Sequence, residues 1–115
     1  MKREMDSDLS KNLMEYENME KQLEVVLIQK HQLQIQLNEV KHALDELKKA
    51  NGAVYRSVGS IVMSTTKEEA EHELKERRDL LDVKINAIAK QEEKLRTTVM
   101  DSQKKLQERL KPHEE

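Results

Sequence analysis

A break in a helical heptad pattern, at residues 51–66, constrains this chain more than any other feature of its sequence. Apolar residues recur with helical spacing on both sides of the break, whereas the break itself holds two β-branched runs around a Gly-Ser pair. The flanking stretches are of nearly equal length, so the simplest arrangement folds the second helix back along the first. Because such a pair buries only one stripe on each helix, we expect function to lie at surfaces and ends rather than in an enclosed active site.

The first stretch carries a heptad register. Its a positions are Tyr16, Leu23, Lys30, Leu37 and Leu44, and its d positions are Met19, Val26, Leu33, Val40 and Leu47. A repeat sustained over this length favours a coiled coil. Lys30 is the only charged member, and we expect its aliphatic stem to pack while its ammonium reaches solvent.

The ends of this first helix have recognisable signals. Asp6, Ser7 and Asp8 are candidate N-cap residues, and their carboxylates suit the positive end of the helix dipole. Two lysines followed by Gly52 make a C-terminal signature. We therefore expect the helix over residues 6–50.

Residues 53–65 predict a β-hairpin with a two-residue type II′ turn at Gly59-Ser60. The predicted pairs are Val58 with Ile61, Ser57 with Val62 and Arg56 with Met63. Apolar side chains then lie on both faces, and a two-stranded ribbon leaves both edges unpaired. We expect hairpins of several chains to pair edge to edge; the alternative is that the hairpin folds back onto its own helices.

The second helix is predicted over residues 67–110, from a capping box at Thr66–Glu69 to the stop signal of Pro112. Its apolar positions are Leu74, Leu81, Ile85, Ile88, Leu95, Val99 and Leu106, and the interruptions are Arg78, Glu92, Ser102 and Arg109. Near the open end, the apolar stripe of both helices slides off the common contact line. This predicts exposed hydrophobic surface at the tips of the coiled coil.

Composition argues against several classes of function. The 23 acidic and 21 basic residues nearly cancel, so no net field attracts nucleic acid or an anionic membrane. The chain has no cysteine, no signal-like apolar run and no stretch of ~20 apolar residues, so we expect a cytoplasmic protein outside the membrane. The 4 histidines are widely separated and no catalytic or phosphate-binding motif is present, so we expect no enzyme, metal or cofactor.

Several stretches resemble the β-type subunits of prefoldin, and together they cover nearly the whole chain. They are Val54-Tyr55-Arg56-Ser57-Val58-Gly59, Ile61-Val62, Lys67-Glu68-Glu69-Ala70, Glu73-Leu74, residues 37–47 and residues 91–95. Heptads alone are a weak signal, but heptads combined with this hairpin are fairly specific. The sixteen residues between the two helices have room for one hairpin only. In this the chain resembles the β type, since α-type subunits carry two hairpins.

The resemblance implies one prefoldin-like domain over residues 1–115 and a mainly α fold, a long antiparallel two-helix coiled coil joined by one β-hairpin. It implies a hexamer of two α-type and four β-type subunits, whose hairpins form a β-barrel platform. The hairpin residues expected in this assembly are Val54, Tyr55, Val58, Gly59, Ile61, Val62 and Met63.

The implied function is that of an ATP-independent chaperone, a holdase that captures non-native proteins and delivers them to a group II chaperonin. The residues expected to contact clients at the tips are Met5, Leu9, Leu13, Met14, Val99, Met100, Leu106 and Leu110. The competing hypothesis is a coiled-coil scaffold or tether without chaperone activity, which shares the heptads but has no need of the hairpin.

Overall fold

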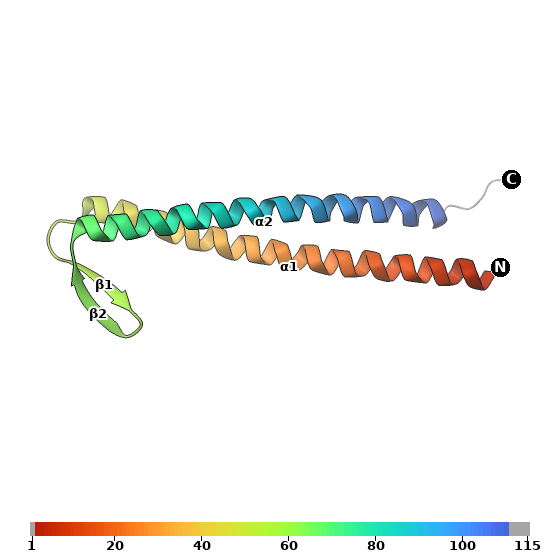
Figure 1. The fold of residues 1–115 in the computed structure, drawn as a ribbon, viewed down its shortest axis with the longest axis horizontal. Coiled ribbons are helices and arrows are strands. Elements are labelled where there is room, and N and C mark those ends of the chain that lie inside the picture. Colours follow the sequence, from red (N-terminus) through yellow and green to blue (C-terminus); the bar gives the residue numbers. More distant parts are fainter. Residues whose placement is uncertain (1, 111–115) are drawn as a thin grey trace. The chain divides into compact units, whose positions relative to one another are not determined.

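The structure, a computed structural model, describes the backbone of residues 2–110 and the side chains of residues 7–110. Its elements are, in order, helix α1 (Lys2–Lys49), strand β1 (Val54–Val58), strand β2 (Ile61–Thr65) and helix α2 (Lys67–Leu110) (Figure 1). Two long helices joined by one antiparallel hairpin confirm the expected mainly α, coiled-coil fold class. In the part of the chain that the structure describes, no helix is both long and apolar enough to cross a membrane.

Burial along both helices follows the predicted heptads. Every predicted a and d position of α1 from Tyr16 to Leu47 is buried or half-buried. On α2 the polar interruptions Arg78, Glu92 and Ser102 are half-buried in the same register, whereas Arg109 is exposed. We call this line of a and d positions the seam.

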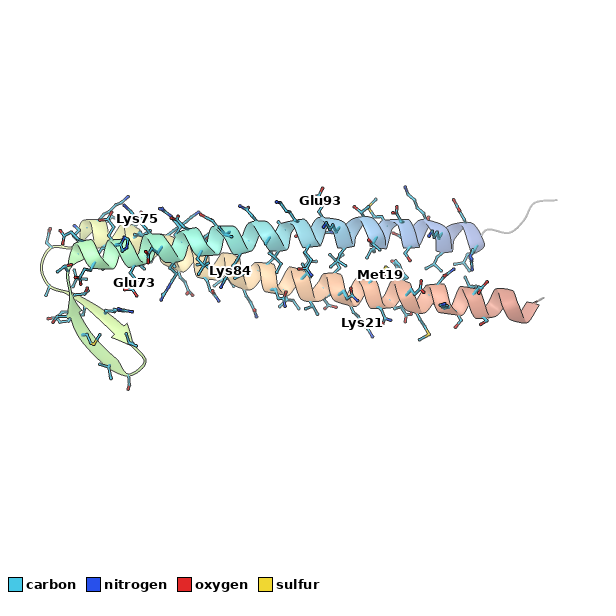
Figure 2. The ribbon with its side chains drawn as sticks, in the orientation of Figure 1. Met19, Lys21, Glu73, Lys75, Lys84 and Glu93 are labelled. Atoms are coloured by element: carbon cyan, nitrogen blue, oxygen red, sulfur yellow. The ribbon has the colours of Figure 1, made fainter. Side chains whose placement is uncertain are left out.

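The chain divides into two compact units, each containing a segment of both helices. The hairpin unit, residues 31–87, has a core of Val40, Leu44 and Leu81, against which Leu33, Leu37 and Leu74 pack. The terminal unit comprises residues 1–30 and 88–115, and in it Val26 and Leu106 are buried. Figure 2 shows Met19, a d residue of this unit, on the side of α1 that faces α2, whereas Lys21 points away.

The N-terminus of α1 differs from the prediction. The helix begins at Lys2, so Asp6, Ser7 and Asp8 lie inside it and do not cap it. The preceding residues are mainly good helix formers without Gly or Pro, so nothing in the sequence stops the helix before it reaches Lys2. Pro112, the predicted stop after α2, lies outside the described residues.

The C-terminus of α1 is closed by a side chain from α2. Gly52 has a φ of +113°, as a residue just beyond a helix end often requires. The Lys67 ammonium donates hydrogen bonds to the carbonyl oxygens of Lys48 at 3.2 Å and Ala50 at 3.4 Å. These carbonyls lack intrahelical partners, so the lysine supplies the donor that they need.

A charged layer interrupts the seam of the terminal unit. Lys30 Nζ donates to Glu92 Oε1 at 2.8 Å, and Arg96 Nε donates to Glu92 Oε2 at 2.8 Å. The expectation that Lys30 simply reaches solvent is therefore incomplete, because its ammonium meets a carboxylate of α2. A one-heptad shift of α2 would place Lys30 beside Ile85 or Val99 instead, so this pair favours the observed register.

The charged layer predicts a pH dependence of stability. Hydrogen bonds from Lys30 and Arg96 lower the pKa of Glu92 below its ordinary value of 4.5. A carboxyl whose pKa is lower in the folded state stabilises that state above its unfolded pKa, and the contribution is lost as the pH falls through the folded pKa. We expect the melting temperature to fall more between pH 7 and pH 3 in the wild type than in Glu92→Gln, measured by circular dichroism.

Glu93→Gln is the matched control. Glu93 follows Glu92 in the sequence but is exposed and points away from α1 (Figure 2). Its substitution should leave the acid-induced decrease at the wild-type value. A Glu92→Gln chain that loses as much thermal stability on acidification as the wild type contradicts the assignment.

Candidate functional site

The hairpin pairs in the predicted register. The strand partners are Val54 and Thr65, Tyr55 and Ser64, Arg56 and Met63, Ser57 and Val62, and Val58 and Ile61. Gly59 has a φ of +59°, and no non-glycine residue of the described chain has a positive φ. A positive φ at the first central position alone matches the predicted type II′ turn.

The hairpin exposes apolar side chains on both faces. Alternation along the strands places Val54, Arg56, Val58, Ile61, Met63 and Thr65 on one face and Tyr55, Ser57, Val62 and Ser64 on the other. Of the residues predicted to mediate assembly, Val54 is half-buried, and Tyr55, Val58, Gly59, Ile61, Val62 and Met63 are exposed. The alternative in which the hairpin buries itself against its own helices is therefore not what the structure shows.

The sheet has two strands, so each edge of the hairpin carries backbone groups with which no further strand of the described chain pairs. A two-residue turn is closed by a hydrogen-bonded pair, here Val58 and Ile61, and bonded and non-bonded pairs then alternate along the ladder. The N–H and C=O groups of Tyr55 and Ser57 consequently point outward from β1, and those of Val62 and Ser64 point outward from β2. Each edge is a template for one further strand.

The base of the hairpin contacts the first turns of α2. The Glu69 backbone N–H donates to Thr66 Oγ1 at 3.1 Å, which is one half of the predicted capping box. The Glu69 carboxylate does not return to the Thr66 backbone; it accepts a hydrogen bond from Thr65 Oγ1 at 3.2 Å. One turn further along α2, Arg56 Nη2 lies 2.7 Å from Glu73 Oε1.

Sequence reasoning missed the contact between Arg56 and Glu73. The available signal was the i, i+4 spacing of Glu69 and Glu73, which places both carboxylates on one face of α2 directly after the hairpin. The face of α2 that this spacing marks is the one that the base of the hairpin contacts.

The predicted client-contact residues fall into three groups. Leu13, Met14, Met100 and Leu110 are exposed, Leu9 and Val99 are half-buried on the seam, and Leu106 is buried with 7% of its surface accessible. The expectation of exposed surface at Leu106 is corrected, because that residue occupies the seam itself. The side chain of Met5 lies outside the described residues.

The exposed members of this set define the apolar helix ends, namely Leu13, Met14, Met100 and Leu110. Leu13 and Leu110 each follow a d position, Asn12 and Arg109, by one residue. In an antiparallel pair these positions flank the same side of the seam. A coiled coil usually has apolar residues on the seam and polar residues beside it. Here the polar residues are on the seam and the aliphatic residues are beside it, which leaves hydrophobic surface accessible.

The grooves near these regions are small and open. One of about 190 Å³ lies at the base of the hairpin and is lined by Tyr55, Arg56, Ser57, Thr65, Ala70, Glu73, Leu74 and Arg77. Another of about 240 Å³ lies in the terminal unit and is lined by Asn12, Glu15, Met19, Thr98, Asp101, Ser102 and Lys105. Both are smaller than the roughly 300–1,000 Å³ of typical ligand pockets. A third hollow, of about 650 Å³, is lined by exposed residues of α2 alone, namely Lys90, Glu93, Lys94, Thr97 and Thr98, so it is not an enclosed site. The binding device that this architecture offers is extended surface.

The fold and the site define a two-helix coiled-coil protein with a single exposed β-hairpin. A family model described as prefoldin subunit matches residues 10–113. The prefoldin subunit beta of Pyrococcus furiosus is 39% identical over 98 residues, covering 84% of each protein. That of Methanosarcina acetivorans is 32% identical over 114 residues, covering 97% of each.

A solved structure agrees with these relatives. The crystal structure of the prefoldin beta subunit from Thermococcus strain KS-1 matches with a TM-score of 0.86 at 35% identity, covering 92% of this chain and 95% of that one. The chain therefore belongs to the prefoldin family, and the resemblance to β-type subunits is confirmed. Members of this family are chaperones rather than enzymes.

Proposed function

We propose that this chain is a β-type subunit of a hetero-oligomeric prefoldin that holds non-native proteins at its apolar helix ends. The observation that carries the proposal is the hairpin, which combines open edges with exposed apolar side chains on both faces. A scaffold that needs only its coiled coil has no use for such an element. The partners are α-type subunits and other β-type copies, in the arrangement of two α and four β that the family resemblance implies.

Edge-to-edge pairing gives the hairpin the further strands, hydrogen-bond partners and packing neighbours that it lacks in the isolated chain. Two strands alone are marginal in water, whereas three or more strands with a hydrophobic face are stable. Pairing satisfies the outward N–H and C=O groups of Tyr55, Ser57, Val62 and Ser64. It also gives Val58, Ile61 and Met63, which share one face, neighbours to pack against. Closing the pairing into a barrel removes every edge.

Client capture rests on the apolar helix ends. Met14 and Met100 carry flexible, polarizable side chains that adapt to surfaces of many shapes. If one chain buries ~200 Å² of client surface at ~25 cal/mol/Å², the gross gain is about 5 kcal/mol before ordering costs. Several chains on one platform raise the overall affinity by roughly 10²–10⁴, because later contacts are intramolecular. Delivery to a group II chaperonin in the cytoplasm follows from the family resemblance and completes the proposal.

The proposed function makes a prediction about assembly. Mixed with an α-type prefoldin subunit, the chain should form a species of six subunits, measured by native mass spectrometry. Val62→Pro removes an outward N–H without touching the ladder inside the hairpin. The substitution leaves a carbonyl of the pairing strand without a donor, which costs roughly 1–3 kcal/mol of assembly free energy for each edge. We expect assembly to weaken by about tenfold or more.

Val62→Ala is the control for the lost side chain, since it keeps the backbone donor. It should assemble better than Val62→Pro, while both variants retain the helical circular dichroism of the wild type. A wild-type chain that remains a monomer or simple dimer with the α-type subunit rejects the proposal and favours the scaffold hypothesis. Equal assembly of the alanine and proline variants rejects edge pairing specifically.

The proposed function also makes a prediction about client capture. Substitution of Leu13, Met14, Met100 and Leu110 by Gln removes the exposed apolar surface and keeps good helix formers. The assembled oligomer should lose most of its ability to suppress aggregation of a chemically unfolded test protein, measured by light scattering. Its mass should not change.

The matched control is Leu80→Gln with Val83→Gln. These residues are exposed aliphatics of α2 in the hairpin unit, comparable in exposure to the apolar helix ends. The control oligomer should protect the test protein as well as the wild type does. Equal protection by the variant with four substitutions and the control means that clients bind elsewhere.

A further inference from the structure

We propose that the ion pair between Arg56 and Glu73 positions the hairpin on α2 and fixes the orientation from which its edges pair with other subunits. The inference rests on the proposed function, because it assigns a role within hairpin-mediated assembly. It adds a specific positioning contact, made by two residues that belong neither to the strand edges nor to the seam.

The contact stands apart from the other ion pairs. Arg56 lies in the middle of β1, and Glu73 lies in the second turn of α2, with 2.7 Å between Nη2 and Oε1. Among the ion pairs of the described side chains, residues 7–110, it is the one that joins a strand to a helix. Figure 2 shows Glu73 on the side of α2 toward the hairpin.

Helix α2 has a row of charged side chains on the face beside the hairpin. Glu69, Glu73 and Arg77 follow one another at intervals of four residues and therefore share one face of α2. Glu69 accepts a hydrogen bond from Thr65 at the base of β2, and Glu73 takes the guanidinium of Arg56 further up the ribbon. The contact between Thr65 and Glu69 thus fixes the base of the hairpin. The contact between Arg56 and Glu73, made from the middle of β1, controls the angle and twist of the hairpin about that base.

The two polar contacts with α2 come from the same face of the hairpin. Arg56 and Thr65 lie on the same face of the ribbon, and both bond to α2. Neither contact involves the other face, with Tyr55, Ser57, Val62 and Ser64, although Tyr55 and Ser57 also line the groove at the base of the hairpin. Since the edges lie between the faces, fixing the faces also fixes the directions in which the outward N–H and C=O groups point.

The connections alone do not determine that orientation. The strands are exposed apart from Val54 and Thr65 at their helix-proximal ends, so packing on the helices contributes little beyond the base. On the α1 side, the connection passes through Gly52, whose lack of a Cβ permits many backbone conformations. A hairpin held only at its base would sample a range of directions.

The ion pair is weak in one chain and effective in an assembly. The side chains of Arg56 and Glu73 are 48% and 37% exposed, and a surface pair of this kind biases an equilibrium by no more than about fivefold. If each of four hairpins must be oriented, the biases multiply to as much as roughly 10²–10³ in the assembly constant. The midpoint concentration of assembly then shifts by about two- to fivefold.

The test uses Arg56→Met and Glu73→Gln, each mixed with an α-type prefoldin subunit and followed over a dilution series by sedimentation velocity. Both variants keep most of the side-chain volume and remove the ionic attraction. We expect the midpoint concentration of assembly to rise about two- to fivefold in each. The exchanged pair, Arg56→Glu with Glu73→Arg, should return the midpoint toward the wild-type value.

Lys75→Met is the matched control. Lys75 is 49% exposed and lies 2.8 Å from Glu71, so its ion pair has nearly the same exposure as that of Arg56, but both partners lie on α2. Figure 2 shows Lys75 on a different side of the helix from Glu73. This variant should assemble with the wild-type midpoint.

A second readout does not depend on assembly. The chain has no cysteine, so spin labels can be placed at Ser60→Cys in the turn and Lys84→Cys on α2, both exposed positions of the hairpin unit. In the isolated chain, Arg56→Met should broaden the distribution of distances between the two labels. The exchanged pair should narrow it again, and Lys75→Met should leave it unchanged.

The outcomes separate this inference from the proposed function. A wild-type chain that does not assemble rejects the proposed function and with it the role assigned here. The wild-type chain can instead assemble while Arg56→Met and Lys75→Met both match it in the midpoint concentration of assembly and in the label distances. That outcome rejects only the positioning role. A weakened Arg56→Met that the exchanged pair fails to restore shows that Arg56 acts through another partner, and this also rejects the ion pair.

Discussion

The seam between the helices is the interaction on which every other feature depends. It buries Val40, Leu44 and Leu81 in the hairpin unit and Val26 and Leu106 in the terminal unit. At roughly 1.5–3 kcal/mol for each fully buried aliphatic side chain, a stripe of this width holds two helices together but leaves no interior for a substrate. The chain has no Phe or Trp with which to enlarge it. Chemistry that needs a dry pocket is therefore disfavoured, and binding has to use edges, faces and ends.

The polar residues of the seam act on specificity more than on stability. Lys30 and Glu92 replace an apolar pair, and such a replacement often costs stability compared with well-packed aliphatic residues. Their pairing favours one register, and register decides which residues lie beside the seam at the helix ends. Exposure of Leu13 and Leu110 beside the polar positions Asn12 and Arg109 depends on that alignment. The charged layer therefore contributes to the exposed surface even though it does not belong to it.

The sequence was most informative where one period governs a long segment. The heptads of α1, the strand partners and the turn at Gly59 follow from local spacing and φ preferences, and all were predicted. Contacts between segments were harder to predict. Lys30 and Glu92 were both recognised as interruptions, but their pairing depends on how far α2 is displaced along α1. Leu106 was recognised as an apolar position of the heptad and was also expected to contact clients at the tip, but its place on the seam buries it.

The pair of Arg56 and Glu73 escaped prediction for a related reason. Strand periodicity predicts the hairpin but carries no information about its orientation relative to the next helix. Side-chain contacts between distant residues set that orientation. The contact is also the kind that is usually dismissed, since an exposed ion pair contributes little to the stability of one chain. Repetition changes that assessment, because a small bias applied to every subunit multiplies in an assembly. In the proposed function, client capture has the same physical basis, since each helix end offers only a modest area and gains affinity when several ends are linked. In that function, assembly at the hairpin precedes effective capture, and the hairpin's orientation influences affinity at helix ends that it does not itself form.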